Sequence, residues 1–196
     1  MVTSSAAAKA ALRGEALERR DRLEPAARAA ASAAIAERAI TVAAGARPAC
    51  IAAYLPIRSE CDPGAIIRWA VGNGIGVALP AVVDATTMVF RRHRPGDPLS
   101  AGGLGTLAPA REAPVVDADL IIMPMIAFDR TGARLGHGRG FYDRAIAVMR
   151  ARGTVPLLVG VAFAVQEVEA IPADAHDVRL DWIVTEREAL DLRDAD

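Results

Sequence analysis

The stretch DLIIMPMIAFDRTGARLGHGRGFYDRA, residues Asp119 to Ala145, decides the fold of this chain. It opens with the run DLIIM, residues Asp119 to Met123, which predicts a short strand buried on both faces. A glycine-rich loop follows, and the run from about Gly140 to Arg152 then predicts a helix. A buried strand that leads through a loop into a helix is typical of an α/β fold with a parallel sheet.

The rest of the chain repeats this alternation of helices and strands. Good helix formers predict helices over about Ala6 to Arg22 and Pro25 to Ala44, and a third helix beginning near Pro63. Further strands are expected at Cys50 to Leu55, Ile75 to Leu79, Thr86 to Arg91, Leu157 to Phe163 and Trp182 to Thr185. The segment Pro95 to Pro114 is dense in glycine and proline and is expected to be irregular.

We therefore expect the α/β class, with a single three-layer α/β/α domain over residues 1–196 and a mostly parallel sheet. The N-terminal helices, within residues 6–44, should pack on that domain. In such sheets, ligands bind beyond the carboxyl ends of the strands, where the glycine-rich loop begins.

Composition excludes several classes of protein. A hydrophobic fraction of 53% with 24% charged residues is globular, and a net charge of −1 argues against a nucleic-acid binder. No apolar run approaches the roughly 18 residues that a membrane helix needs. The cysteines Cys50 and Cys61 form no disulfide framework and no metal-binding spacing. We expect a cytoplasmic protein that works as a monomer, with a dimer as the alternative, and that has no membrane or nucleic-acid partner.

The loop after the predicted central strand alternates small and cationic residues. Its glycines are Gly132, Gly136, Gly138 and Gly140, and its arginines are Arg134, Arg139 and Arg144. Glycine lets the backbone approach a ligand closely, so that successive N–H groups and the following helix terminus can face an anion. Arginine forks suit phosphate oxygens. A solvated surface loop is the alternative, but the strand-loop-helix context favours phosphate binding; the Walker and GxGxxG patterns are absent.

The first turn of the helix after this loop carries an acidic residue and two aromatic ones. Asp143 would lie beside any phosphate held by the loop, and a carboxylate there is explained by a bridging Mg²⁺. Compensation of the helix N-terminus is the alternative reason for Asp143. Phe141 and Tyr142 precede it, and we expect one of them to face a ligand and the other the core.

Four stretches of the sequence resemble one protein family. They are KAALR (Lys9 to Arg13), YLPIRSE (Tyr54 to Glu60), MPMIAFDRTGARLGHGRGFYDR (Met123 to Arg144) and VGVAFAVQEVEAIPADAHDVRLDWIVTE (Val159 to Glu186). Their order and sequence resemble the 5-formyltetrahydrofolate cyclo-ligase (5,10-methenyltetrahydrofolate synthetase) family. The resemblance implies a ligase of folate-dependent one-carbon metabolism, with ATP as co-substrate and Mg²⁺ as metal. ATP would phosphorylate the formyl oxygen of 5-formyltetrahydrofolate, and N10 would then attack the activated carbon.

The resemblance also implies which residues form the site. The ATP-binding residues would be Lys9, Arg13, Arg134, Leu135, Gly136, His137, Gly138, Arg139 and Gly140. The metal would be held by Asp143 and Asp177, and the folate by Leu55, Glu60 and Tyr142. Arg134, Arg139 and Tyr142 would act in catalysis. Lys9 and Arg13 lie four residues apart, so one helix face can present both to one anion.

Three features depart from the pattern that the resemblance leads us to expect. His137 stands where many members have Arg or Tyr, and Phe141 where Tyr is common. The stretch Gly102 to Pro109 lacks an aromatic-plus-acidic pattern expected near the pterin. A family member that binds folate or nucleotide without turnover is therefore one alternative. A sugar-phosphate isomerase or lactonase on a similar scaffold is another, although it would have no use for Lys9 and Arg13 together.

Overall fold

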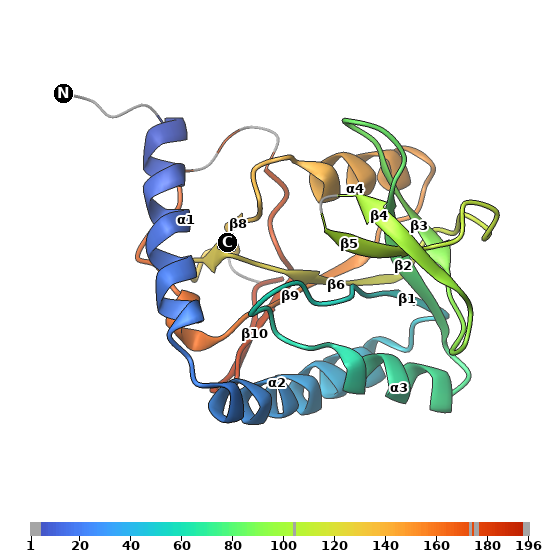
Figure 1. Ribbon diagram of the computed structural model, residues 1–196, viewed down its shortest axis with the longest axis horizontal. Coiled ribbons are helices and arrows are strands. Elements are labelled where there is room, and N and C mark those ends of the chain that lie inside the picture. Colours follow the sequence, from blue (N-terminus) through green and yellow to red (C-terminus); the bar gives the residue numbers. More distant parts are fainter. Residues whose placement is uncertain (1–4, 104, 173, 175–176, 194–196) are drawn as a thin grey trace.

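A seven-stranded sheet runs through the centre of the computed structural model, which describes residues 5–103, 105–172, 174 and 177–193 (Figure 1). The strand order is β11-β10-β9-β6-β1-β2-β3. The strands are β1 (Cys50–Ala52), β2 (Gly76–Val82), β3 (Met88–Arg92), β6 (Leu120–Pro124), β9 (Leu157–Val161), β10 (Trp182–Val184) and β11 (Ala189–Asp191). Each pairing from β10 to β2 is parallel, whereas the edge strands β3 and β11 are antiparallel to their neighbours. The predicted mostly parallel sheet is confirmed.

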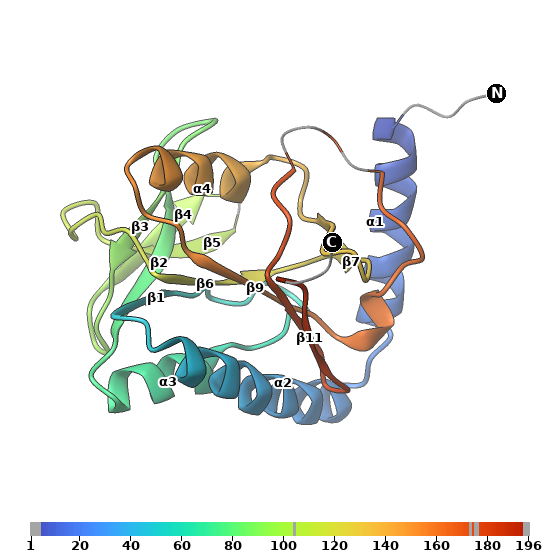
Figure 2. The same ribbon diagram turned by 180° about the vertical axis from the view of Figure 1, so that it is seen from behind.

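Helices cover both faces of this sheet. They are α1 (Ser5–Asp21), α2 (Pro25–Ala46), α3 (Gly64–Gly72) and α4 (Phe141–Ala151). Helices α2 and α3 lie along one face and α4 lies on the other, which gives the predicted three layers, while α1 stands beside the sheet (Figures 1 and 2). Pro25 begins α2, where a missing N–H costs no hydrogen bond.

Strand β6 shows why its sequence is apolar without alternation. Ile122 packs into the cluster formed with α2 and α3, whereas Ile121 and Met123 pack into the cluster formed with α4. All three side chains are fully buried. Successive strand residues point to opposite faces, so a strand covered on both sides must be apolar at every position.

The expectation of irregular structure over Pro95 to Pro114 is wrong. Strands β4 (Leu99–Gly103) and β5 (Thr106–Pro109) form an antiparallel hairpin there. A Cβ on Gly102 would lie 2.8 Å from Oγ1 of Thr106, so the glycine permits the two strands to approach closely. Glycine therefore marks a close backbone contact within a hairpin here, rather than the end of regular structure.

Other differences are smaller. The strand predicted over Cys50 to Leu55 is shorter in the structure, where β1 ends at Ala52. A second hairpin, formed by β7 (Ala127–Phe128) and β8 (Arg134–Leu135), was not predicted, nor was the 3-10 turn η1 (Ala164–Gln166). Within the described residues, none of the helices combines the length and the apolarity required to cross a membrane.

Candidate active site

A cleft of about 790 Å³ opens beyond the carboxyl ends of the central strands β1, β2 and β6. Tyr54 and Leu55, which follow β1, line it together with Pro124 at the end of β6. Every residue that the sequence predicted for the site lines this one cleft: Lys9, Arg13, Leu55, Glu60, Arg134, Leu135, Gly136, His137, Gly138, Arg139, Gly140, Tyr142, Asp143 and Asp177. The fold thus brings together segments from the beginning, the middle and the end of the chain.

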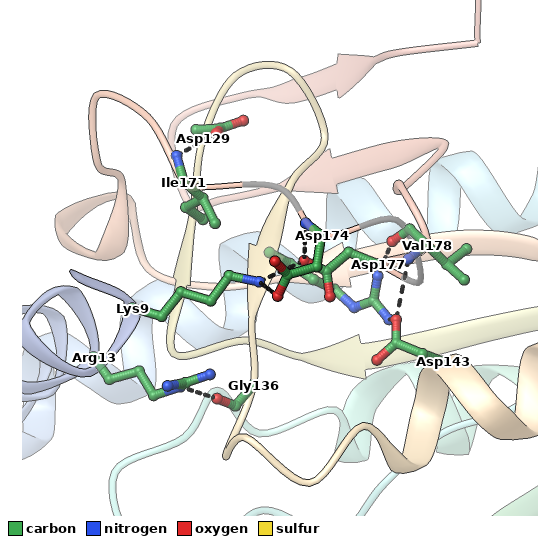
Figure 3. Close-up of polar contacts among 10 residues, drawn as sticks. Lys9, Arg13, Asp129, Gly136, Asp143, Ile171, Asp174, Asp177 and Val178 are labelled. Carbon is green, nitrogen blue, oxygen red and sulfur yellow. Dashed lines mark hydrogen bonds and ion pairs between the residues drawn. The ribbon is translucent and has the colours of Figure 1, made fainter. Parts of the chain in front are cut away.

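Helix α1 supplies two cations to one end of the cleft. The buried ammonium of Lys9 donates hydrogen bonds to Oδ2 of Asp174 at 2.7 Å and to Oδ2 of Asp177 at 2.6 Å (Figure 3). Nε of Arg13, one helical turn further on, donates to the carbonyl oxygen of Gly136 at 2.8 Å. The helix that stands beside the sheet therefore contacts both the glycine-rich loop and the loop that carries Asp174.

The glycine-rich loop takes a backbone path that only glycine adopts readily. Gly138 has φ 84° and Gly140, at the N-cap of α4, has φ 62°, both in the left-handed region. Arg144 stabilises this backbone conformation, because its guanidinium donates hydrogen bonds to the carbonyl oxygens of Thr86 and Arg139 at 2.7 Å each. Arg139 itself is exposed on the cleft side of the loop.

Arg134 and Asp143 form an ion pair beneath the loop. Nη2 of Arg134 donates to Oδ1 of Asp143 at 2.7 Å, and Nη1 of Arg134 donates to the carbonyl oxygen of Val178. The same Oδ1 accepts a hydrogen bond from the backbone N–H of Val178 at 3.1 Å. Strand β8, helix α4 and the segment after Asp177 therefore meet at this pair (Figure 3).

The carboxylates around Lys9 change its acid-base properties. Burial alone would lower the pKa of Lys9, but its hydrogen bonds to Asp174 and Asp177 raise that pKa above the ordinary value. Burial would likewise raise the pKa of Asp177, but the hydrogen bond from Lys9 holds it below the ordinary value. Lys9 is thus a charged group that Asp174 and Asp177 hold at the cleft. Asp174 was not among the predicted site residues, because one acid in a loop has no periodic signal.

The other end of the cleft is more apolar. Glu60 lies there almost buried, with Oε2 accepting the backbone N–H of Ile57 at 3.0 Å and Oε1 3.3 Å from Nε2 of His137. The ring of Tyr142 is tilted against Phe90 at 6.2 Å between centroids, and burial raises the pKa of its phenol. Met88 and Leu107 add apolar walls that the sequence did not predict.

No preformed metal cage is present in the part of the chain that the structure describes, since no three His, Cys, Asp or Glu side chains gather suitably. Asp143 and Asp177, the predicted metal ligands, both line the cleft. Each is paired with a cation, Asp143 with Arg134 and Asp177 with Lys9. Carboxylate oxygens are the donors that Mg²⁺ prefers, and Mg²⁺ commonly takes one or two of them together with substrate phosphates.

Comparison with known proteins points to one family. The model of the 5-formyltetrahydrofolate cyclo-ligase family matches residues 5–186. The 5-formyltetrahydrofolate cyclo-ligase of Haemophilus influenzae is 32% identical over 136 residues, which cover 66% of this chain and 72% of the relative. That of Mycolicibacterium smegmatis is 31% identical over 153 residues, covering 71% of this chain and 75% of the relative.

Solved structures agree. The 5,10-methenyltetrahydrofolate synthetase of Aquifex aeolicus superimposes with a TM-score of 0.79 at 31% identity, covering 95% of this chain and 93% of its own. The Mycoplasma pneumoniae 5,10-methenyltetrahydrofolate synthetase has a TM-score of 0.73 at 23% identity, over 91% of this chain and 98% of its own, which shows a shared fold.

Proposed function

Since the chain belongs to the 5-formyltetrahydrofolate cyclo-ligase family, we propose that it converts 5-formyltetrahydrofolate and ATP into 5,10-methenyltetrahydrofolate, ADP and phosphate. The observation that carries the proposal is that one cleft holds both sets of residues: cations from α1 face the glycine-rich loop, while Glu60 and Tyr142 line the other end. An anionic co-substrate and a flat heteroaromatic one match these two ends in chemistry.

The proposed reaction overcomes two chemical obstacles. A formamide carbon is a poor electrophile, and its oxygen is a poor leaving group. Transfer of the γ-phosphoryl group of ATP to the formyl oxygen removes both obstacles. N10 then attacks the formyl carbon, the C–O bond breaks, and the N10 proton ends on the released phosphate. The protein contributes mainly positioning and charge stabilisation to such a transfer.

We assign the triphosphate to the cationic end of the cleft. Lys9, Arg13 and Arg134 surround this end, and the backbone from Leu135 to Gly140 turns through two left-handed glycines. Successive N–H groups in such a turn, followed by a helix N-terminus, attract phosphate oxygens. Arg134 and Arg139 are the groups that we propose to stabilise the charge of the transferring phosphoryl group.

We propose that Mg²⁺ enters with the nucleotide and is held by Asp143 and Asp177. These carboxylates fit a magnesium ion that also keeps phosphate oxygens as ligands, because both line the cleft beside the loop. When bound, the metal would neutralise phosphate charge. Before binding, Arg134 and Lys9 compensate the two carboxylates, so the arrival of Mg·ATP would exchange one set of ion pairs for another.

The folate is assigned to the end formed by Leu55, Glu60 and Tyr142. The buried carboxylate of Glu60 can accept hydrogen bonds from the amino and N–H groups of the pterin. Tyr142 offers a ring face beside the apolar side chains of Met88 and Leu107. The β4–β5 hairpin therefore supplies an aliphatic wall where the resemblance led us to expect an aromatic one.

The direct test is to follow the absorbance of methenyltetrahydrofolate after purified protein is mixed with Mg·ATP and 5-formyltetrahydrofolate. Absence of turnover with correctly folded protein would refute the proposal. Titration calorimetry with each substrate alone adds a second readout. Heat from both substrates without product would identify a binding protein that has lost catalysis.

The setting of the enzyme is also a proposal. We propose that it acts in the cytoplasm, which its free cysteines, Cys50 and Cys61, support. We also propose a monomer, because residues of one chain line both ends of the cleft. Sedimentation equilibrium across a range of protein concentrations tests the oligomeric state.

A further inference from the structure

Arg20, near the end of α1, is one of the largest fully buried side chains, with 2% of its surface exposed. Its Nε donates to Oγ of Ser59 at 3.0 Å, while its Nη1 is buried and has no hydrogen-bond partner among the described residues. Burying an arginine is unfavourable unless nearby negative charge compensates it. A helix that needed only to stay attached would not require such a residue at this position.

The compensating charge lies in the loop that enters the cleft. Ser59 directly precedes Glu60, whose side chain is only 5% exposed. Burial lowers the pKa of Arg20, and Glu60 is the strongest of the charges that oppose this shift. Asp21 also lies near: its Oδ1 is 3.8 Å from Nε of Arg20 and accepts a hydrogen bond from Oγ of Ser59. The Asp21 side chain is 59% exposed, so solvent screens much of its charge.

The face of α1 that carries Arg20 is the face that lines the cleft. Residues 9, 13, 16 and 20 are spaced by three and four positions and so form one stripe of the helix. Lys9 and Arg13 lie on this stripe at the phosphate end of the cleft, and Arg20 lies on it beside the loop of Glu60. One helix therefore lines the phosphate end of the cleft with Lys9 and Arg13 and contacts the loop that carries Glu60 through Arg20.

We propose that Arg20 is a positioning residue for folate: through Ser59 and the charge of Glu60 it holds the Glu60 carboxylate in place to bind the pterin. This inference rests on the proposed function, which assigns folate to Glu60. A purely structural role, holding α1 on the molecule, would affect Lys9 and Arg13 as well. The two roles therefore differ in which substrate is lost.

The chain offers a matched control in the adjacent residue. Arg19 also anchors α1, because its Nε donates to the carbonyl oxygen of Val165 at 2.6 Å and its Nη2 to that of Glu167 at 3.2 Å. These hydrogen bonds go to the segment of η1 and its end, and not to Ser59 or Glu60. Arg19→Ala thus removes an arginine anchor from the same helix and leaves the contact between Arg20 and Ser59 intact.

The experiment measures KM separately for 5-formyltetrahydrofolate and for Mg·ATP in the wild type and in Arg20→Gln, Arg20→Lys and Arg19→Ala. Arg20→Gln should raise the KM for folate about tenfold or more, while the KM for Mg·ATP stays within about twofold. Arg20→Lys, which keeps the charge, should recover part of the loss. Arg19→Ala should not raise the KM for folate selectively over the KM for Mg·ATP. In a Glu60→Gln background, Arg20→Gln should cause little further loss of folate affinity.

Equal increases of both KM values in Arg20→Gln, or no increase, would overturn the inference. If Arg20→Gln fails to fold in thermal melts, Ser59→Ala decides the matter, because it removes the acceptor of Nε and should raise the KM for folate alone. A wild type without turnover and without heat on adding folate would instead refute the proposed function. An active wild type with unselective variants would refute only the role of Arg20.

Discussion

The ammonium of Lys9 lies 2.6 Å from the carboxylate of Asp177, so an ion pair joins the first helix to a loop 168 residues further along the chain. Asp174 accepts a second hydrogen bond from the same ammonium at 2.7 Å. We assign Lys9 to ATP and Asp177 to Mg²⁺, so two groups proposed for different ligands form an ion pair with each other. The pairing keeps a buried lysine charged until phosphate arrives.

The pairing predicts how stability depends on pH. The pKa of Asp177 is held below 3.8, so its contribution is present above that value and is lost as the pH falls through the folded pKa. The pKa of Lys9 is raised above 10.5, so its contribution is present below that value and is lost at still higher pH.

Asp177→Asn should therefore lower Tm by a constant amount between about pH 5 and pH 9. The free energy of unfolding should fall by at most about 1 kcal/mol, because the Asp177 side chain is 39% exposed and Asp174 still pairs with Lys9. As the pH falls below 3.8 and through the lower folded pKa of Asp177, the Tm of the variant and of the wild type should converge. Differential scanning calorimetry across this range provides the measurement. A difference that grows as the pH falls would contradict the ion pair.

Arg134→Ala should weaken ATP binding far more than folate binding. The change removes a guanidinium from the phosphate end and leaves Asp143 without its cation, and we expect an increase of about tenfold to a hundredfold in the Kd for Mg·ATP. The Kd of Arg134→Lys for Mg·ATP should lie between those of the wild type and of Arg134→Ala. An ammonium keeps the charge but cannot reproduce the contacts to both Asp143 and Val178. Titration calorimetry with each substrate measures the effect.

Arg150→Ala is the control for this prediction. Arg150 is an exposed residue in the last turn of α4, at the end of the helix opposite to the glycine-rich loop. Its removal should leave both affinities unchanged. Equal losses of ATP and folate affinity in Arg134→Ala would show that Arg134 supports the cleft as a whole rather than the phosphate end.

The sequence predicted the parts of the site whose signals are local. The glycine-rich loop follows a strand that is apolar at every position, and that pattern indicated both the parallel sheet and the edge at which the cleft opens. Lys9 and Arg13 lie four residues apart in a segment rich in helix-forming residues, so their position on one helix face was predictable. Their assignment to ATP came from the family resemblance.

Other features depend on contacts between distant segments and had no local signal. Arg20 belongs to the charged run EALERRD, which is typical of a solvated helix face, yet tertiary packing buries it against Ser59. Asp174 is a single acid in a loop, and only the fold brings it to Lys9. The β4–β5 hairpin was missed because Gly102 and Gly105 usually interrupt strands, whereas here they allow close pairing and a tight turn.

Gly138→Ala tests the conformation of the glycine-rich loop. Gly138 has φ 84°, and an L-residue in this region costs roughly 1–2 kcal/mol. A Cβ there would lie 3.5 Å from the guanidinium of Arg13, an ordinary contact, so the strain comes from the backbone alone. We expect a lower Tm and weaker Mg·ATP binding, measured by calorimetry, as the loop relaxes away from its native path.

Gly14→Ala should raise Tm, in contrast to Gly138→Ala. Gly14 lies exposed within α1 with nothing within 4 Å of an added Cβ, so alanine should stabilise the helix by about 0.5–1 kcal/mol. ATP affinity should not fall in this variant. Similar destabilisation by both substitutions would show that the left-handed backbone at Gly138 is not the cause.

Asp129→Ala tests what holds the loop of Asp174 and Asp177. Asp129 is buried, and its Oδ2 accepts the backbone N–H of Ile171 at 2.8 Å (Figure 3). Its Oδ1 accepts the backbone N–H of Thr131 at 2.9 Å. Removing the carboxylate leaves the buried N–H of Ile171 without its acceptor, which costs about 1–3 kcal/mol. The segment that begins at Ile171 leads to the two carboxylates that hold Lys9, so its anchor should matter for ATP.

We therefore expect Asp129→Ala to lower Tm and to raise the KM for Mg·ATP several-fold, while the KM for folate changes little. Asp97→Ala is the matched control, because Asp97 also accepts a backbone N–H, that of Arg94 at 2.7 Å, but on the exposed surface. Thermal melts and steady-state kinetics on both variants separate stability from binding. A lower Tm in Asp129→Ala with both KM values unchanged would mean that Lys9 alone suffices to hold Asp174 and Asp177, because the ion pair would then position the loop without its buried anchor.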